Sequence, residues 1–486
     1  MKCKGSVTVF LALLLTCIFS GLFAFLEAAR VSGLKASSQM CTMQAKDGLL
    51  ASYHTLLWEK YRLLFWEGDF PDLSDAESLQ QEIIAGNRGQ KGMGQNYDVL
   101  SIALKKAEVR EYLLATDHGG ISFCKQAAKM MEQEVAKDAL ESVKDLLLSS
   151  QNGKTEAEAA DRQKSALQVL EDLQNNHNEK TKDSAVADSK GNEDTVSVPD
   201  NPIQWMKDMK KKGILAVLMP DRDISVKKTD WSESVSKRKL QEGTSTIKYK
   251  VTVLEKVLFR LYLEDCFSNV LEEKEDGALE YEMEYLIGGK SSDKANLKAA
   301  VNRLLLSREA ANLAFLETNP EKQQIALAAA AAITTAVGQP ALTEPVKHGI
   351  LAAWAYAESL SDVRILLDGG KVSIIKTGEQ WHTQLDHLSA GIKSTAGENQ
   401  QKGLSYTGYL QLLLWTMQDK KLSLRAMDLI EKDTGIRMDH MICRMECDYE
   451  YEAPALFWKF VRLGDHSFSD YLFHEQATLS YLDENK

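Results

Sequence analysis

The sequence is poor in the residues and spacings that mark a disulfide scaffold, a zinc site or a nucleic-acid surface. It has seven cysteines in 486 residues, and none is paired in the CxxC spacing of a structural zinc site. They are also too few and too scattered for a disulfide-stapled fold, so the redox compartment stays open. The net charge of −12 argues against the clustered Lys and Arg that a nucleic-acid partner requires.

Motifs for catalysis are also missing from the sequence. There is no GxSxG nucleophile elbow. The stretch GGKSS at residues 288–292 resembles the end of a P-loop, but Glu284 stands where that motif needs its first glycine, so we interpret it as a strand-to-helix turn. His382 and His387 are five residues apart instead of the four of HExxH, and we interpret both as surface residues. The sequence therefore indicates no catalytic residues, no cofactor and no metal.

Residues 7–26 form a run of twenty positions without a charge. At about 1.5 Å per residue, a helix of this length matches a hydrocarbon core of roughly 30 Å. A cleaved signal peptide has a shorter apolar region of about 7–15 residues, although Ala28 and Ala29 would allow cleavage. We predict a retained transmembrane helix that contacts membrane lipid through residues 7–26.

The charges that flank this helix are nearly balanced. Lys2 and Lys4 precede it, and Arg30, Lys35 and Lys46 follow it, which is a near tie under the positive-inside rule. Because the leader is very short and the following chain is long, we expect a cytoplasmic N-terminus. The protein would then be a single-pass protein of the cell membrane with the bulk of its chain outside the cell.

Apolar residues continue at helical spacing from Val31 to Leu64. The span and this stalk could form one helix of up to sixty residues, weakened by Gly33 and Gly48. Two alternatives stay open at this point. The stalk either packs laterally against helices of partner proteins or folds onto its own domain.

Composition divides the rest of the chain. An amphipathic helix is predicted over 121–149 and a second helical stretch over 165–173. Residues 175–202 contain almost no large apolar side chain, which is typical of a linker. The predicted organisation is a leader with a transmembrane helix at 1–26, a stalk and helical membrane-proximal region at 27–174, a flexible linker at 175–202 and an α+β ectodomain at 203–486.

Three segments alternate between apolar and charged residues, which is typical of half-buried strands. They are LEYEMEYLI at 279–287, MICRMECDYEYE at 441–452 and a shorter one at 247–253. Lys248 and Lys250 of the third segment would relieve repulsion between the acidic faces of the other two. We therefore predict an antiparallel sheet within a mostly helical domain.

Three apolar helices are predicted between these strands. Ser292 is a good N-terminal cap for the first, Pro320 opens the second, and the third runs from Glu344 to Leu367. The apolar run of the second is too short to cross a membrane and the third carries charges, so we predict buried core helices. The fold class is therefore α+β.

The charges on the third of these helices are its Glu358, Asp362 and Arg364. A charged side chain on an apolar helix needs a partner, because burying an unpaired charge is costly. We predict that the three residues form an internal polar network or mark a contact with a partner protein.

Several segments together resemble a known family. KGSVTVFLALLL, LEAARVSGLK, EYLIGGKSSDKANLKAAVNRLLLSREAANLAFL, AWAYAESLSDVRILLDGGKV and GLSYTGYLQLLL are similar to a domain of unknown function in proteins of clostridia and related Firmicutes. The resemblance covers nearly the whole chain except the polar linker. Members are commonly encoded beside tight-adherence (Tad or Flp type) pilus and type II/IV secretion components. This implies protein partners in such an apparatus and supplies no catalytic residues.

The N-terminus also resembles a pilin-like leader. Lys4 and Gly5 precede Ser6 and an apolar helix, so that a prepilin peptidase would cut between Gly5 and Ser6. Pilins carry a glutamate at the fifth mature position, where this chain has Phe10, and the acid within reach is Glu27 at the far end of the span. This departure favours a minor, pseudopilin-like or accessory subunit over a major pilin.

These observations lead to a hypothesis on function. The protein would be a non-enzymatic, membrane-anchored extracytoplasmic component of a Tad-like pilus or surface assembly system. The alternative is a membrane-tethered cell-surface enzyme or ligand-binding protein whose site the sequence does not reveal.

Overall fold

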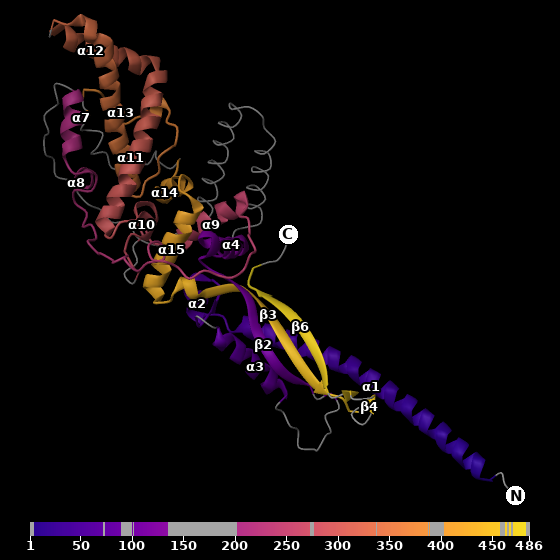
Figure 1. Cartoon of the computed structure of the whole chain (residues 1–486). Coiled ribbons are helices and arrows are strands. Elements are labelled where there is room, and N and C mark those ends of the chain that lie inside the picture. The colour runs from indigo at the N-terminus through magenta and orange to yellow at the C-terminus, as the bar shows by residue number, and fades with distance from the viewer. Residues whose placement is uncertain are drawn as a thin grey trace. The chain divides into compact units, whose positions relative to one another are not determined.

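A computed structural model of the chain (Figure 1) describes residues 4–70, 73–88, 100, 102–134, 202–272, 277–336, 338–386, 388, 403–456, 462–463, 466–467 and 470–482. The chain divides into two compact units. Unit 1 consists of residues 1–126, 239–250 and 437–486, and unit 2 of residues 127–238 and 251–436. Each unit is built from separate stretches of the chain, whereas each region predicted from the sequence is one continuous stretch. The predicted helix at 165–173, the linker up to residue 201 and the predicted helix 121–149 beyond residue 134 lie outside the described residues.

Unit 1 combines helices with the antiparallel sheet, which confirms the α+β class. Helix α4, Asp117–Glu134, crosses from unit 1 into unit 2 along the chain. The other elements of unit 1 are α1 Lys4–Ala51, α2 Thr55–Tyr61, β1 Trp66–Glu67, α3 Ser74–Arg88, β2 Ala103–Leu114, η4 Met438–His440, β3 Met441–Pro454, β4 Arg462–Leu463, β5 His466–Ser467 and β6 Asp470–Ser480.

Strand β3 is the centre of the sheet and confirms the strand predicted at 441–452. It pairs antiparallel with β2 along one edge, and with β1 and then β6 along the other. Its apolar side chains, among them Cys447, Tyr449 and Tyr451, are buried in one core with residues of α1 and α3. Its acidic side chains face the other way and are partly exposed, as an alternating strand requires.

The predicted strand at 247–253 is wrong. Residues 247–252 belong to no strand and form no ladder, and α9 begins at Val253. The backbone N–H of Ser245, two residues before this segment, donates a hydrogen bond to the carbonyl oxygen of Tyr112 in β2. The lysines that face the acidic strand come from β2 instead, where Lys105 pairs with Glu450 at 3.0 Å. The membrane-proximal region predicted as helical therefore contains a long strand.

Helix α1 is continuous from the apolar run into the packed part of unit 1. Of the two alternatives for the stalk, the structure has the helix folded onto its own domain, because α1 packs on α3 and β6. Gly48 does not break the helix. A Cβ atom there would lie 2.6 Å from Ile83 Cδ1 of α3, so the glycine allows close packing of the two helices. The helix ends at Ala51, short of the predicted sixty residues.

Unit 2 is helical in its described part. Its core is centred on α13, whose residues from Ile350 onward are mostly buried, and the three predicted helices are found as α11, α12 and α13. The prediction that all three are buried is wrong for α12, where Ala326, Ala330 and Thr334 are buried but Ile325 and Leu327 are exposed. The elements are α7 Pro202–Lys211, α8 Ile214–Leu218, α9 Val253–Cys266, α10 Glu282–Gly288, α11 Asp293–Thr318, α12 Pro320–Ala336, η1 Pro340–Leu342, α13 Thr343–Leu367, η2 Gly378–Gln380, α14 Tyr406–Trp415 and α15 Asp419–Thr434.

The predicted strand at 279–287 is also wrong, because its second half is helix α10. The alternation of apolar residues and glutamates predicted a strand with one face in water, but Glu282 and Glu284 are buried like their apolar neighbours. Glu282 accepts hydrogen bonds from the backbone N–H and the hydroxyl of Ser268, and Glu284 from the backbone N–H of Val270. Both carboxylates thus have internal donors, and neither faces water. The GGKSS segment consequently joins two helices, with Ser292 as the N-cap of α11.

Candidate functional site

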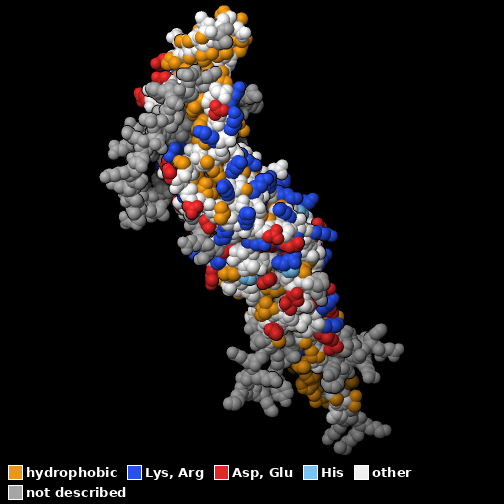
Figure 2. Space-filling view, turned by 90° about the vertical axis from the view of Figure 1, so that its left-hand side faces the viewer, with side chains coloured by type: hydrophobic (Ala, Val, Ile, Leu, Met, Phe, Trp, Pro, Cys, Tyr) orange, Lys and Arg blue, Asp and Glu red, His pale blue; other side chains and the backbone are white. Residues whose placement is uncertain are grey.

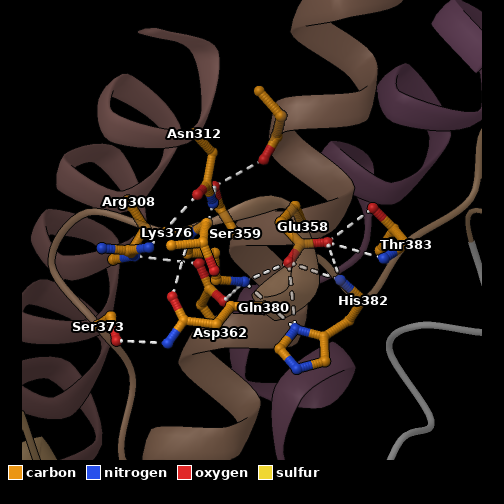
Figure 3. Close-up of polar contacts among 12 residues, drawn as sticks. Arg308, Asn312, Glu358, Ser359, Asp362, Ser373, Lys376, Gln380, His382 and Thr383 are labelled. Atoms are coloured by element: carbon orange, nitrogen blue, oxygen red, sulfur yellow. Dashed lines mark hydrogen bonds and ion pairs between the residues drawn. The ribbon is translucent and has the colours of Figure 1, made fainter. Parts of the chain in front are cut away.

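The candidate site of unit 2 begins with two acidic residues on α13. Glu358 and Asp362 are four residues apart, so both lie on the same helix face, and both are fully buried. Arg308 and Asn312 have the same spacing on α11 and point toward them (Figure 3). The two helices pack along their lengths, and this packing brings the four side chains together.

The chain returns to α13 immediately after the helix ends. Gly369, with φ of +85°, follows the helix, and Val372 exchanges two backbone hydrogen bonds with Leu404. Thr377 and Gln380 then form a capping box around η2. These local bonds hold the segment so that Lys376 and His382 reach Glu358 (Figure 3).

Glu358 is surrounded by donors. Its Oε2 accepts hydrogen bonds from the backbone N–H and the hydroxyl of Thr383, each at 2.8 Å, and its Oε1 from the backbone N–H of His382 at 3.0 Å. Lys376 Nζ donates to the same Oε1. Burial would raise the pKa of Glu358, but the bonds from His382 and the charge of Lys376 outweigh it and lower the pKa to about 2. Glu358 is therefore an anion.

Asp362 is held mainly through its Oδ2 atom. Arg308 Nε donates to this oxygen at 3.0 Å and Asn312 Nδ2 at 2.9 Å. Arg308 also donates to the carbonyl oxygen of Ile374 at 2.8 Å and to the hydroxyl of Tyr409 at 3.0 Å. Oδ1 faces Lys376 Nζ, with which it forms an ion pair. The guanidinium is thus fixed by helices α11, α13 and α14 and by the segment after α13.

The charges of this cluster balance. Glu358 and Asp362 are opposed by Arg308 and Lys376, and the side chains of all four are at most 2% exposed. Pairing is required, because removing one partner from a buried ion pair typically costs about 3–5 kcal/mol. The predicted internal polar network is therefore built around these residues.

Three residues of the cluster have the chemistry of metal ligands. Glu358, Asp362 and His382 each offer a ligand atom, and these atoms lie within 4.8 Å of one another. The Lys376 ammonium group, however, contacts both carboxylates and lies 3.3 Å from His382 Nδ1. A divalent ion would have to displace this buried lysine and would leave its charge unpaired. The residues present therefore do not fit a metal.

An aromatic group lies beside the cluster. Trp381 stacks on Phe315 and contacts Trp354 edge to face, with ring centroids 5.1 and 5.9 Å apart. Lys322 of α12 lies over both indole rings, 4.7 Å from Trp354 and 5.1 Å from Trp381. Burial lowers the pKa of Lys322. The cluster is therefore bordered by rings, and His382, whose side chain is 24% exposed, is its partly exposed member.

The sequence prediction found only part of this site. Glu358 and Asp362 are in the network, but Arg364 is not, because its side chain points elsewhere and pairs with Asp368 at 3.9 Å. The buried cations are Arg308 and Lys376, which sequence reasoning missed. The i, i+4 spacing of Arg308 and Asn312 within an apolar helix was the available signal.

The other predicted residues are placed as follows. His382, interpreted as a surface residue, is partly buried against Glu358, and His387 lies outside the described residues. Gly5 and Ser6, the residues of the predicted leader cleavage, lie at the start of α1, and their side chains are not among those described.

The N-terminal part of α1 is the second functional feature. Its apolar side chains are exposed from Val7 at 62% to Leu26 at 42%, and Phe25 reaches 75%. Figure 2 shows hydrophobic side chains at the bottom of the view, on this part of the helix. Among the described residues, α1 is the one helix long and apolar enough to cross a membrane.

The exposed run ends abruptly at Glu27. This residue is 1% exposed and pairs with Arg30, which is 4% exposed, at 3.3 Å. Its Oε1 also accepts a hydrogen bond from the backbone N–H of Leu456. From here on α1 is part of the core of unit 1.

Comparison with known families gives one match. The profile of a family of unknown function, DUF5702, matches residues 192–453, more than half of the chain. The chain belongs to this family. No curated protein and no solved structure matches it. The DUF5702 match contains the whole buried cluster and ends within β3, whereas α1 and β2 lie outside it.

Proposed function

We propose that the protein is a membrane-anchored, non-enzymatic extracytoplasmic component of a Tad-like pilus or surface assembly apparatus, as a pseudopilin-like or accessory subunit. The observation that carries the proposal is the exposed apolar run of α1 at residues 7–26. Exposing a large apolar side chain to water costs about 1.5–3 kcal/mol relative to burying it, so the thirteen large apolar side chains exposed between Val7 and Leu26 require an apolar solvent. Lipid supplies that solvent.

The connection between the anchor and unit 1 is rigid. The apolar run and the packed part of α1 form one uninterrupted helix, and Glu27 and Arg30 are buried at the point where they meet. The membrane surface would then lie close to Glu27. A rigid stem of this kind suits a subunit that fixes its domain at a set height above the membrane.

The same contacts favour an accessory role over that of a major pilin. In a pilin the glutamate near the N-terminus pairs with the amino terminus of a neighbouring subunit. Here Glu27 is occupied by Arg30 and Leu456 of its own domain. The Tad assignment itself is what the sequence resemblance implies. The orientation is the one expected from a very short leader before a long chain, because the flanking charges are nearly balanced.

The buried cluster supports a non-enzymatic role. Both of its carboxylates and its lysine are almost inaccessible, and their charges are balanced internally. A substrate would have to displace side chains to reach them. The cluster therefore serves to hold α11, α13 and the following segment together.

Localisation and processing of the full chain test the proposal. Cells producing it are fractionated, intact cells are shaved with protease, and the N-terminus is sequenced. We expect membrane retention and digestion from outside, with cleavage between Gly5 and Ser6 if the subunit enters the fibre. The uncleaved chain dissolved in the cytosol would refute the proposal, and turnover of a substrate by the purified protein would favour the tethered enzyme.

A pair of variants separates anchoring from folding. Leu14→Lys combined with Ile18→Lys places charges in the exposed run, where each costs about 2.5–3.5 kcal/mol at the centre of a membrane helix. Met43→Lys is the control, because Met43 is 65% exposed on the same helix but lies after Glu27, outside the apolar run. Only the double variant should leave the membrane fraction.

A further inference from the structure

We propose that Lys376 and Asp362 are joined by an intramolecular amide bond, formed within the folded chain without another enzyme, with Glu358 carrying the proton that must be moved. This inference does not rest on the proposed function. It assigns to the buried cluster a covalent modification site between α13 and the segment that follows it.

The position of the lysine amine distinguishes the two carboxylates. Lys376 Nζ contacts both Asp362 Oδ1 and Glu358 Oε1. The contact with Glu358 is a hydrogen bond. Among the described residues, none forms a hydrogen bond with Asp362 Oδ1, although this oxygen is buried and lies in contact with the amine. The amine therefore lies against the Asp362 carboxyl group without a hydrogen bond to its Oδ1, whereas its contact with Glu358 is a hydrogen bond.

The other oxygen of Asp362, Oδ2, already accepts hydrogen bonds that would stabilise the negative charge created by attack of the amine on the carboxyl carbon. When an amine adds to a carboxyl carbon, negative charge develops on the oxygen that remains. Oδ2 accepts hydrogen bonds from Arg308 Nε at 3.0 Å and Asn312 Nδ2 at 2.9 Å. These two donors would stabilise the developing oxyanion. Glu358 has no comparable cation on the oxygen that faces away from Lys376, where its donors are the uncharged groups of Thr383 and the His382 backbone.

The reaction balances with the groups present. The Lys376 ammonium group passes one proton to Asp362 Oδ1, and the neutral amine then attacks Cγ of Asp362. A C–N bond forms, giving a tetrahedral intermediate whose nitrogen is protonated and acidic. Glu358 Oε1 takes this proton and passes it to the Oδ1 hydroxyl, which leaves as water when the C–O bond breaks. An ammonium and a carboxylate become an amide and one water molecule, and no oxidant or cofactor is needed.

Burial favours each step. Fixed reacting groups can reach effective concentrations on the order of 10⁵–10⁸ M, which removes the entropy cost of bringing them together. A buried site also excludes the water that would reverse the reaction. The released water would leave on the side of His382, which borders the cluster and is partly exposed. After the reaction, Arg308 and Glu358 remain as one balanced buried pair.

Intact mass spectrometry of the full-length protein under denaturing conditions tests the proposal. We expect the wild-type mass to be lower than that of the sequence, after any N-terminal processing, by the mass of one water molecule. Digestion should yield a branched peptide that links Lys376 to Asp362. A wild-type mass without this loss, or a link that ends on Glu358, would overturn the assignment.

Three variants and one control test the roles. Lys376→Arg keeps the charge but lacks the amine, and Glu358→Gln keeps the shape but cannot carry the proton, so both should show the full mass. In Asp362→Asn, attack of the Lys376 amine on the side-chain amide would release ammonia. Any link formed in this variant must therefore lower the protein mass by the mass of one ammonia molecule instead of one water molecule. Lys371→Arg changes a lysine of the same segment and should keep the link. Loss of water in Glu358→Gln or in Lys376→Arg would contradict the roles assigned to these two side chains, and circular dichroism verifies that each variant is folded.

Discussion

Glu284 on α10 gives the clearest prediction on stability. Its side chain is completely buried, and its Oε1 accepts hydrogen bonds from the Tyr406 hydroxyl at 2.8 Å and the Val270 N–H at 3.1 Å. No described group forms a hydrogen bond with its Oε2. Burial raises the pKa of Glu284 to about 7, because the two hydrogen bonds only partly offset the loss of hydration.

The sign of the pH dependence follows from this shift. The folded state binds the Glu284 proton more tightly than the unfolded state, whose pKa is 4.5. The resulting stabilisation is fully present below the unfolded pKa and is lost as the pH rises through about 7. At about 1.4 kcal/mol per unit of pKa, the loss amounts to about 3 kcal/mol.

Glu284→Gln is the perturbation that isolates this effect. The amide oxygen still accepts both hydrogen bonds, and the side chain stays neutral at every pH, like the protonated acid. We expect equal unfolding free energies for wild type and variant at about pH 4.5, and a variant more stable by about 3 kcal/mol above about pH 7.

Denaturant unfolding of the full chain in detergent, followed by circular dichroism over a series of pH values, measures the difference. Glu317→Gln, an exposed glutamate on α11, is the matched control and should leave the curve of the wild type unchanged. A difference between wild type and Glu284→Gln that does not vary with pH would refute the reasoning.

Two further substitutions test local features of unit 2. Asp293→Asn should lower the unfolding free energy by about 2 kcal/mol. The buried carboxylate accepts hydrogen bonds from the Ser225 hydroxyl and from two backbone N–H groups, and in the variant the amide N–H₂ would face one of these donors. Asp368→Asn, at a half-exposed side chain, is the control. Gly403→Ala should cost about 3 kcal/mol, because φ is +130° and the new Cβ would lie 2.3 Å from the Val372 carbonyl carbon. Gly378→Ala, with open space around it, should change the thermal midpoint little, and equal effects at both glycines would contradict this reading.

Local sequence pattern was sufficient where a whole helix or strand repeats one period. It located α11, α12 and α13 and the central strand β3, and it identified the apolar run of α1. It failed for α10, because alternation at 279–287 looks the same whether the glutamates meet water or buried donors such as Ser268. It also missed β2, whose partner β3 lies more than 300 residues later in the chain.

The candidate site shows the same division. The sequence by itself determined that Glu358 and Asp362 share one face of an apolar helix and need partners, because helical spacing and the cost of burying charge are local properties. Only the tertiary structure decided that Arg308 and Lys376 are those partners and that Arg364 is not. Such a choice depends on which helix faces meet and where the following segment returns. Those contacts arise from packing between residues distant in sequence, which no local period encodes.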